Sequence, residues 1–196
     1  MVLNTPNVLT LLRIALIPLF IVAYYLPVSW ANVLTTTLFV AAALTDWLDG
    51  YLARRLDQSS PFGAFLDPVA DKLMVAVALV LLVADDRSHA LSLQSIILTL
   101  VVVVIIGREI AISALREWMA EIGARAHVAV SVVGKVKTIA QMLAIPFLLY
   151  REPLLGLPIF RIGEVLLYVA AGLTLWSMLA YLRAAWPALS GPGEGG

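Results

Sequence analysis

The sequence predicts an all-α fold, that of a polytopic membrane protein with six transmembrane helices. Of its 196 residues, 62% are hydrophobic and 13% are charged, and the mean hydropathy is +0.97. Soluble domains are about half apolar, and a soluble core of this size cannot hide so much apolar surface. Helices that face lipid need no polar stripe. Apolar stretches also recur along the chain. Charged residues interrupt several of them, each time at the end that would face the same side of the membrane.

Six apolar stretches are the candidate helices, at residues 8–26, 28–44, 73–84, 91–106, 138–150 and 165–182. The first is interpreted as a retained span rather than a signal peptide, because no Lys or Arg precedes its apolar run. Several stretches are shorter than the roughly 20 residues that cross a bilayer. Their number nevertheless favours membrane helices over buried helices of a soluble protein. If the helices continue through the charges that interrupt them, all the charged ends lie on one side of the membrane.

The distribution of cations predicts which side that is. Cytoplasmic segments carry an excess of Lys and Arg, and here ten of the thirteen cations share one face. The ten are Arg13, Arg54, Arg55, Lys72, Arg108, Arg116, Arg125, Lys135, Lys137 and Arg183, and the other three are Arg87, Arg151 and Arg161. Both termini are therefore expected in the cytoplasm, and residues 27–30, 85–90 and 151–163 are expected to be outer turns. A single membrane domain is expected over residues 1–189, followed by a disordered tail at 190–196.

Composition excludes several classes of function. Thirteen Lys and Arg balance thirteen Asp and Glu, so the net charge gives no attraction to nucleic acid, and no such partner is expected. The sequence has no cysteine, which excludes a disulfide framework, a thiolate metal site and a thiol nucleophile. A metal ion would have to be bound by oxygen atoms or by the two histidines.

Four aspartates form two pairs in the first polar stretch. Asp46 and Asp49 are three residues apart at the end of the second helix, so they share one helix face. Asp67 and Asp71, four apart at the start of the third helix, do the same. Carboxylates placed close together repel one another unless cations neutralise them, and with phosphate oxygens they suit Mg²⁺ or Mn²⁺. Two such ions can clamp a pyrophosphate for in-line displacement. The alternative is that these residues only cap helices or mark the membrane interface.

This segment resembles the signature of the CDP-alcohol phosphatidyltransferase family, D-x2-D-G-x2-A-R-x8-G-x3-D-x3-D. The fixed positions are Asp46, Asp49, Gly50, Ala53, Arg54, Gly63, Asp67 and Asp71. The resemblance implies that Asp46, Asp49 and Asp67 bind the metal ions. It implies that Asp71 completes the cluster and acts as the general base. The cytidine diphosphate site would be lined by Gly50, Ala53, Arg54 and Gly63. Because Gly50 and Ala53 have minimal side chains, they leave room for a ligand, and Gly63 is expected to allow the turn between the helices.

The second polar stretch carries four cations at the cytoplasmic ends of two further helices, namely Arg108, Arg116, Lys135 and Lys137. An anionic acceptor requires such cations, and a phosphate group fits them. The alternative is anchoring by contacts with lipid headgroups. Glu109 and Glu117 are expected to orient or balance the cations. Together the two polar stretches predict an active-site cavity at the cytoplasmic side.

Two further stretches resemble the branch of the family whose acceptor is sn-glycerol 3-phosphate, namely N4-T-P-N-V-L-T10-L-L-R13 and R108-E-I-A-I-S-A-L-R-E-W-M-A-E121. The resemblance extends over nearly all of residues 4–183. It implies CDP-diacylglycerol as the donor, with phosphatidylglycerol phosphate and CMP as products. It also implies two Mg²⁺ or Mn²⁺ ions, a homodimer, contact with membrane lipids and a place in the bacterial inner membrane.

Two alternatives stay open at this point. The same chemistry could use another acceptor, such as inositol phosphate, serine or phosphatidylglycerol. A divalent-cation transporter would instead favour acidic residues near the bilayer midplane on several helices. The acidic residues lie at one edge, and residues 75–84 and 91–106 contain as polar side chains only Ser92, Gln94, Ser95 and Thr99.

Overall fold

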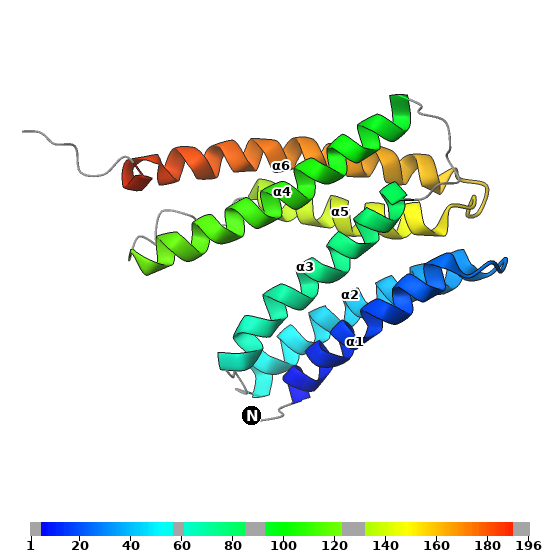
Figure 1. The fold of residues 1–196 in the computed structure, drawn as a ribbon, viewed down its shortest axis with the longest axis horizontal. Helices are drawn as coiled ribbons and strands as arrows, with labels where there is room; N and C mark the ends of the chain where they lie inside the picture. The colour runs from blue at the N-terminus through cyan, green and yellow to red at the C-terminus, as the bar shows by residue number, and fades with distance from the viewer. Residues whose placement is uncertain (1–4, 57–60, 85–92, 123–131, 190–196) are drawn as a thin grey trace, which may run out of the picture. The chain divides into compact units, whose positions relative to one another are not determined.

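In the computed structural model, the described residues are 5–56, 61–84, 93–122 and 132–189, and they form six α-helices and no strand (Figure 1). The helices are α1 (Thr5–Tyr25), α2 (Ala31–Leu56), α3 (Pro61–Ala84), α4 (Leu93–Glu121), α5 (Val132–Tyr150) and α6 (Ile159–Leu189). The all-α class is confirmed for this part of the chain. The predicted tail at 190–196 lies outside it.

The helices do continue through the charged residues that interrupt the apolar stretches. Helix α2 runs past Asp46 and Asp49, and α4 runs past Arg108. Within the part of the chain that the structure describes, three stretches are long and apolar enough to cross a membrane, at Val8–Tyr25, Ser95–Glu121 and Ile159–Arg183. In α2 and α3 the aspartates shorten the apolar part, which covers Ala31–Asp46 and Lys72–Ala84.

The surface of the helices is also apolar. Large apolar side chains are exposed on all six helices, among them Leu12, Leu44, Val80, Val103, Ile139 and Trp176. Exposing this apolar surface to water is unfavourable in free energy, whereas contact with lipid chains is not. With the three long apolar stretches, it makes the chain an integral membrane protein.

Several threonine hydroxyls within the helices bond to the backbone of their own helix. The hydroxyls of Thr35 and Thr99 donate to the carbonyl oxygens of Ala31 and Ser95, four residues earlier, at 2.7 and 2.8 Å. Such a bond lets a polar side chain stay inside a helix that is surrounded by apolar groups. These polar residues therefore need no partner on another helix.

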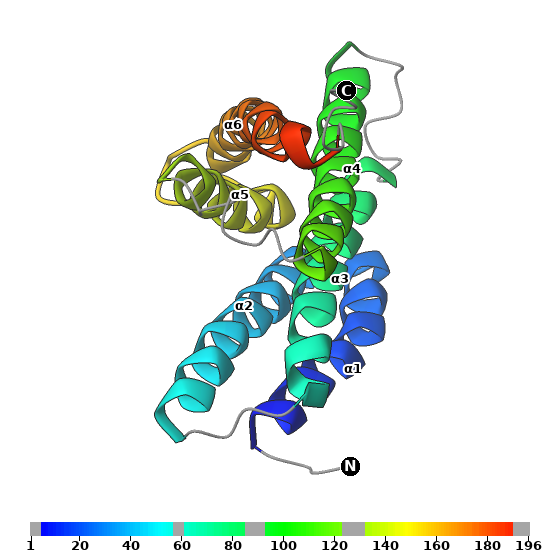
Figure 2. The same cartoon turned by 90° about the vertical axis from the view of Figure 1, so that its left-hand side faces the viewer.

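The chain forms two compact units, and the first comprises residues 1–88 and 145–163. In this unit α1 packs against α2 and α3 (Figures 1 and 2). The rings of Phe20 and Phe39 lie 6.3 Å apart between α1 and α2. Ala42, Ala70 and Ala78 are buried, and such small side chains let membrane helices approach closely.

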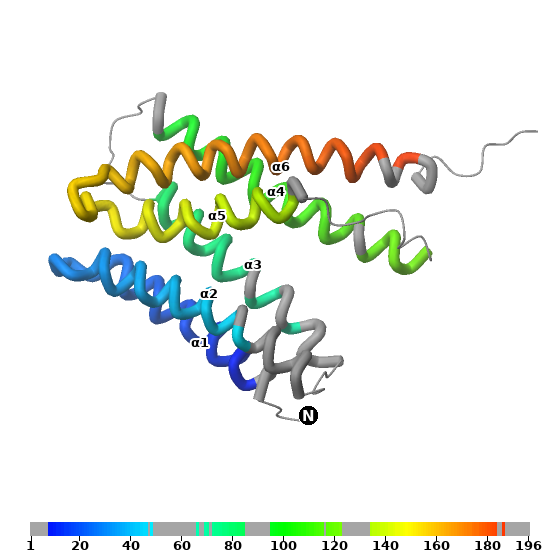
Figure 3. Tube along the Cα trace, turned by 180° about the vertical axis from the view of Figure 1, so that it is seen from behind, coloured from blue at the N-terminus to red at the C-terminus, as the bar shows by residue number. Residues whose placement is uncertain are grey.

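The second unit comprises residues 89–144 and 164–196. Here α5 and α6 lie side by side, as Figure 3 shows from behind. Buried apolar residues on α4 include Ile105, Ile112 and Met119, and Ala140 of α5 and Ala170 of α6 are buried as well. Polar contacts join α4 to both of the other helices, and they form the site described below.

Two predicted turns differ from the structure. The connection after α5 ends before Ile159 rather than at residue 163, because α6 already includes the charged Arg161. This connection turns tightly, with left-handed φ values of 53° at Leu155 and 79° at Gly156. Gly63 is expected to allow the turn between α2 and α3, but the structure places it inside α3, which begins at Pro61. Proline favours the first helical position, so Gly63 lies in the first helical turn.

Tyr24 connects three segments of the first unit, and Tyr24→Phe tests its contribution to stability. Its hydroxyl donates to the carbonyl oxygen of Leu81 at 2.8 Å and accepts from Arg151 Nη2 at 2.5 Å. We expect the free energy of unfolding to fall by about 1–3 kcal/mol, because a buried acceptor loses its donor. The measurement is thermal unfolding in detergent. Tyr25→Phe is the matched control, since Tyr25 is exposed, and equal melting temperatures for the two variants would contradict the assignment.

Candidate active site

The hairpin of α2 and α3 brings the two predicted aspartate pairs to matching levels. The helices run antiparallel and are joined by residues 57–60 (Figure 1). Asp46 and Asp71 each lie ten residues from the hairpin ends of their helices, and Asp49 and Asp67 lie seven and six residues from them. At a rise of 1.5 Å per residue, Asp46 and Asp71 both lie about 15 Å from the hairpin end of their helix. Asp49 and Asp67 both lie about 10 Å from it. Four carboxylate-bearing positions at matching levels are a suitable donor set for hard divalent ions.

Most side chains of the signature residues on this hairpin lie outside the described part of the structure. They are those of Asp49, Ala53, Arg54, Asp67 and Asp71, together with the surroundings of Gly50 and Gly63. Within the residues that are described, no three Asp, Glu or His side chains are grouped as a metal site. The side chain of Asp46 is described, and it forms an ion pair.

The cation of this ion pair is Arg13 of α1. Arg13 is 1% exposed, and its Nη1 lies 2.5 Å from Oδ1 of Asp46, whose side chain is 35% exposed. A cation buried in an apolar helix is costly unless it is paired, and Asp46 supplies the pairing. In the sequence analysis Arg13 is counted only as one of the ten cations on the cytoplasmic face, and its pairing with Asp46 is missed. Its place within an otherwise apolar helix is the signal that could have identified it.

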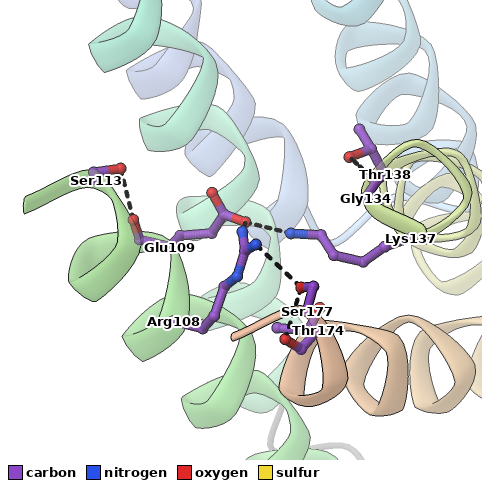
Figure 4. A network of polar contacts seen from close by, with 8 residues as sticks. All are labelled: Arg108, Glu109, Ser113, Gly134, Lys137, Thr138, Thr174 and Ser177. Carbon is purple, nitrogen blue, oxygen red and sulfur yellow. Dashed lines mark hydrogen bonds and ion pairs between the residues drawn. The ribbon is translucent and has the colours of Figure 1, made fainter. Parts of the chain in front are cut away.

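Glu109 is the centre of a polar network in the second unit (Figure 4). Lys137 Nζ of α5 donates to Glu109 Oε1 at 2.6 Å, and Arg108 Nη1 donates to the same oxygen at 3.1 Å. Lys137 is only 4% exposed. The prediction that Glu109 balances the cations is therefore confirmed for these two. Two positive charges share one negative charge, and the group as a whole keeps a positive charge that favours an anion.

Helix α6 completes this network with residues that the sequence patterns do not single out. Ser177 Oγ accepts from Arg108 Nη2 at 3.1 Å and donates to the carbonyl oxygen of Thr174 at 2.9 Å. The ring of Tyr181 lies 5.7 Å from Arg108 Cζ, within the range of a cation–π contact. The spacing 174, 177, 181 places these side chains on one helix face, and it is the signal that could have found them.

Of the two remaining predicted acceptor residues, Arg116 and Lys135, the structure describes the side chain of Lys135 alone. Lys135 is exposed although Lys137 is buried, because two residues along a helix correspond to a rotation of about 200°. The side chain of Arg116 lies outside the described residues, and Glu117 is exposed. Of the four predicted cations, the structure brings together Arg108 and Lys137.

The fold and the site define the class of protein: a helical membrane protein that carries two pairs of aspartates on one helical hairpin. Residues 3–176 match the sequence profile of the CDP-alcohol phosphatidyltransferases, and the chain belongs to this family. Three bacterial relatives carry the name CDP-diacylglycerol–glycerol-3-phosphate 3-phosphatidyltransferase. The protein of Pseudomonas fluorescens is 55% identical over 192 residues, covering 97% of this chain and 94% of the relative. Those of Pectobacterium atrosepticum and Salmonella typhimurium are 56% and 54% identical over 182 residues, covering 93% of this chain and 94% of each relative.

Proposed function

We propose that the protein transfers the phosphatidyl group of CDP-diacylglycerol to sn-glycerol 3-phosphate, giving phosphatidylglycerol phosphate and CMP. The observation that carries this proposal is the similarity to relatives named for the reaction, which share more than half of their residues with this chain over nearly its whole length. The two partly neutralised cations at Glu109 support a phosphate-bearing acceptor.

The donor would bind at the α2–α3 hairpin. Asp46, Asp49 and Asp67, with Asp71, would hold two Mg²⁺ or Mn²⁺ ions, and the matching levels of these positions support this donor set. When bound, the ions neutralise charge on the pyrophosphate and orient it. The cytidine diphosphate would lie against four residues of the family signature. Three of them, Gly50, Ala53 and Gly63, have small side chains, and the fourth, Arg54, is a cation.

In the transfer step Asp71 would remove the proton from the acceptor hydroxyl. The hydroxyl oxygen forms a bond to the phosphorus that carries the diacylglycerol. The bond from that phosphorus to the oxygen of CMP breaks, and CMP leaves with the electron pair. The residues of the hairpin contribute mainly by positioning the two reactants in line.

The acceptor phosphate would be bound by Arg108, Arg116, Lys135 and Lys137. In the described residues, Arg108 Nε and Thr174 Oγ1 are buried polar atoms that make no hydrogen bond. Buried polar groups are nearly always hydrogen-bonded, so these two atoms support a polar ligand beside the Glu109 network. An Arg can bind two phosphate oxygens at once, and a buried Lys adds a point charge.

The reaction suits an enzyme that lies in the bacterial inner membrane as a homodimer with six spans in each subunit and both termini in the cytoplasm. Helices α2, α3 and α5 would add three spans to the three long apolar helices, with their charged ends at the cytoplasmic side. A CDP-lipid keeps its acyl chains in the bilayer while its charged head must reach water. A cavity at the cytoplasmic ends of the helices meets both requirements and admits a soluble acceptor.

Ser177→Ala tests whether α6 helps to hold Arg108 for the acceptor. The variant removes the oxygen that accepts from Arg108 Nη2. A typical hydrogen bond contributes about 0.5–1.5 kcal/mol, so we expect the KM for glycerol 3-phosphate to rise by about 2- to 10-fold with kcat little changed. The control is Thr138→Val, because that exposed hydroxyl bonds to Gly134 of its own helix. Equal KM values for Ser177→Ala and the parent would exclude this contribution.

The proposed reaction is tested by CMP release from CDP-diacylglycerol in detergent, with Mg²⁺ or Mn²⁺ and a panel of acceptors. The acceptors are glycerol 3-phosphate, inositol phosphate, serine and phosphatidylglycerol. We expect metal-dependent release with glycerol 3-phosphate and none with the others. Release with another acceptor would keep the aspartate chemistry but overturn the acceptor assignment. No release with any acceptor, from folded protein, would contradict the transferase.

A further inference from the structure

Arg13 is the one charged residue of α1 in a stretch of 21 residues. It is almost completely buried, and it lies outside the aspartate signature in the sequence. A buried guanidinium carries a large desolvation penalty, and a membrane helix keeps such a residue only where it has a function or a strong partner. It forms an ion pair with the first aspartate of the signature, Asp46, 33 residues further along the chain.

The contact leaves part of the Asp46 carboxylate for another ligand. Arg13 Nη1 donates to Oδ1, and this contact does not occupy Oδ2. The side chain of Asp46 is 35% exposed, whereas that of Arg13 is 2% exposed. A buried arginine therefore holds the carboxylate at Oδ1, while about a third of the Asp46 side chain as a whole stays exposed.

We propose that Arg13 is a positioning residue for the metal site, which holds the Asp46 carboxylate through Oδ1 so that Oδ2 binds a divalent ion. This inference rests on the proposed function, which makes Asp46 a metal ligand. Side chains that hold a metal ligand fix its orientation, and their loss typically lowers metal affinity by about 10- to 100-fold. Arginine suits this role because its planar fork gives a defined direction to the hydrogen bond.

The test is Mn²⁺ binding by the full-length protein in detergent, followed by electron paramagnetic resonance of the free ion. For Arg13→Gln we expect the dissociation constant of Mn²⁺ to rise by about 10- to 100-fold. The matched control is Arg151→Gln, since Arg151 is a half-buried arginine of the same unit that bonds to Tyr24. We expect this control to lose stability without losing affinity for Mn²⁺.

A folded Arg13→Gln variant whose Mn²⁺ affinity stays within about twofold of the parent would overturn the inference. Arg13→Lys decides the case if the Gln variant does not fold, as judged by circular dichroism and size exclusion. The lysine nitrogen lies one bond nearer the backbone, so it cannot hold Oδ1 in the same place, and weaker Mn²⁺ binding is expected. Unchanged binding in a folded Lys variant would overturn the inference as well.

Asp46→Asn separates failure of this inference from failure of the proposed function. If Asp46→Asn weakens Mn²⁺ binding and Arg13→Gln does not, Asp46 is a ligand and Arg13 has only a structural role. If neither variant changes Mn²⁺ binding, the metal site itself is assigned to the wrong residues. Where both weaken it, the double variant should bind Mn²⁺ no more weakly than Asp46→Asn, because residues that act through one contact are not additive. A further loss in the double variant would show that Arg13 acts elsewhere.

Discussion

Asp71→Asn is expected to abolish phosphatidyl transfer while CDP-diacylglycerol binding is partly kept. The amide has nearly the shape of the carboxylate but cannot take the proton of the acceptor hydroxyl. General-base catalysis contributes about 10²- to 10⁴-fold, and loss of a charge from the metal cluster adds to the defect. The measurements are CMP release and equilibrium binding of the CDP-lipid to the same purified protein.

The control for this variant is Asp57→Asn, which makes the same chemical change at a position outside the fixed residues of the signature. It should retain turnover. Near-normal CMP release by Asp71→Asn would remove Asp71 from the role of general base. Loss of turnover together with complete loss of CDP-lipid binding would assign Asp71 to binding alone.

Lys137→Ala is expected to raise the KM for glycerol 3-phosphate more than any change at an exposed cation. Hydrogen bonds to charged groups contribute about 1.5–3 kcal/mol, which corresponds to about a 10- to 150-fold change. The loss also leaves Glu109 with Arg108 as its remaining cation in this network. Glu109 then neutralises Arg108 more completely, so the Glu109 network loses its net positive charge and contributes little attraction for an anion.

Two further variants make this result specific. Lys135→Ala removes a predicted acceptor cation that is exposed, and its effect on the KM should be in the same direction but smaller. Arg183→Ala removes an exposed cation of α6 that has no assigned role, and its KM should equal that of the parent. An unchanged KM for Lys137→Ala would indicate that these cations only anchor the protein to lipid headgroups.

The sequence predicts the helices well because apolar runs and charges are local features. Helix α2 illustrates this, since its continuation past Asp46 and Asp49 follows from the length that a bilayer crossing requires. The beginning of α6 is misjudged because Arg161 looks like a loop residue, although a charge near a helix end is readily solvated. Gly63 is misjudged because Pro61 starts the helix two residues before it.

The candidate site is only partly predictable for a different reason. Spacing places Asp46 with Asp49 and Asp67 with Asp71, but the separate roles of the four follow only from the family resemblance. The contacts Arg13–Asp46 and Arg108–Ser177 join residues 33 and 69 positions apart, and no local pattern encodes such pairs. Lys135 and Lys137 look equivalent in the sequence, yet the helical rotation between them leaves one exposed and buries the other.

The most direct test of the proposed reaction is to follow the label when purified protein is given CDP-diacylglycerol, Mg²⁺ and radiolabelled glycerol 3-phosphate. We expect the label to enter the lipid fraction in a one-to-one ratio with the CMP released, and a chelator to stop both. CMP release without labelled lipid would mean hydrolysis of the donor, and neither product from folded protein would mean that this chain is not the transferase.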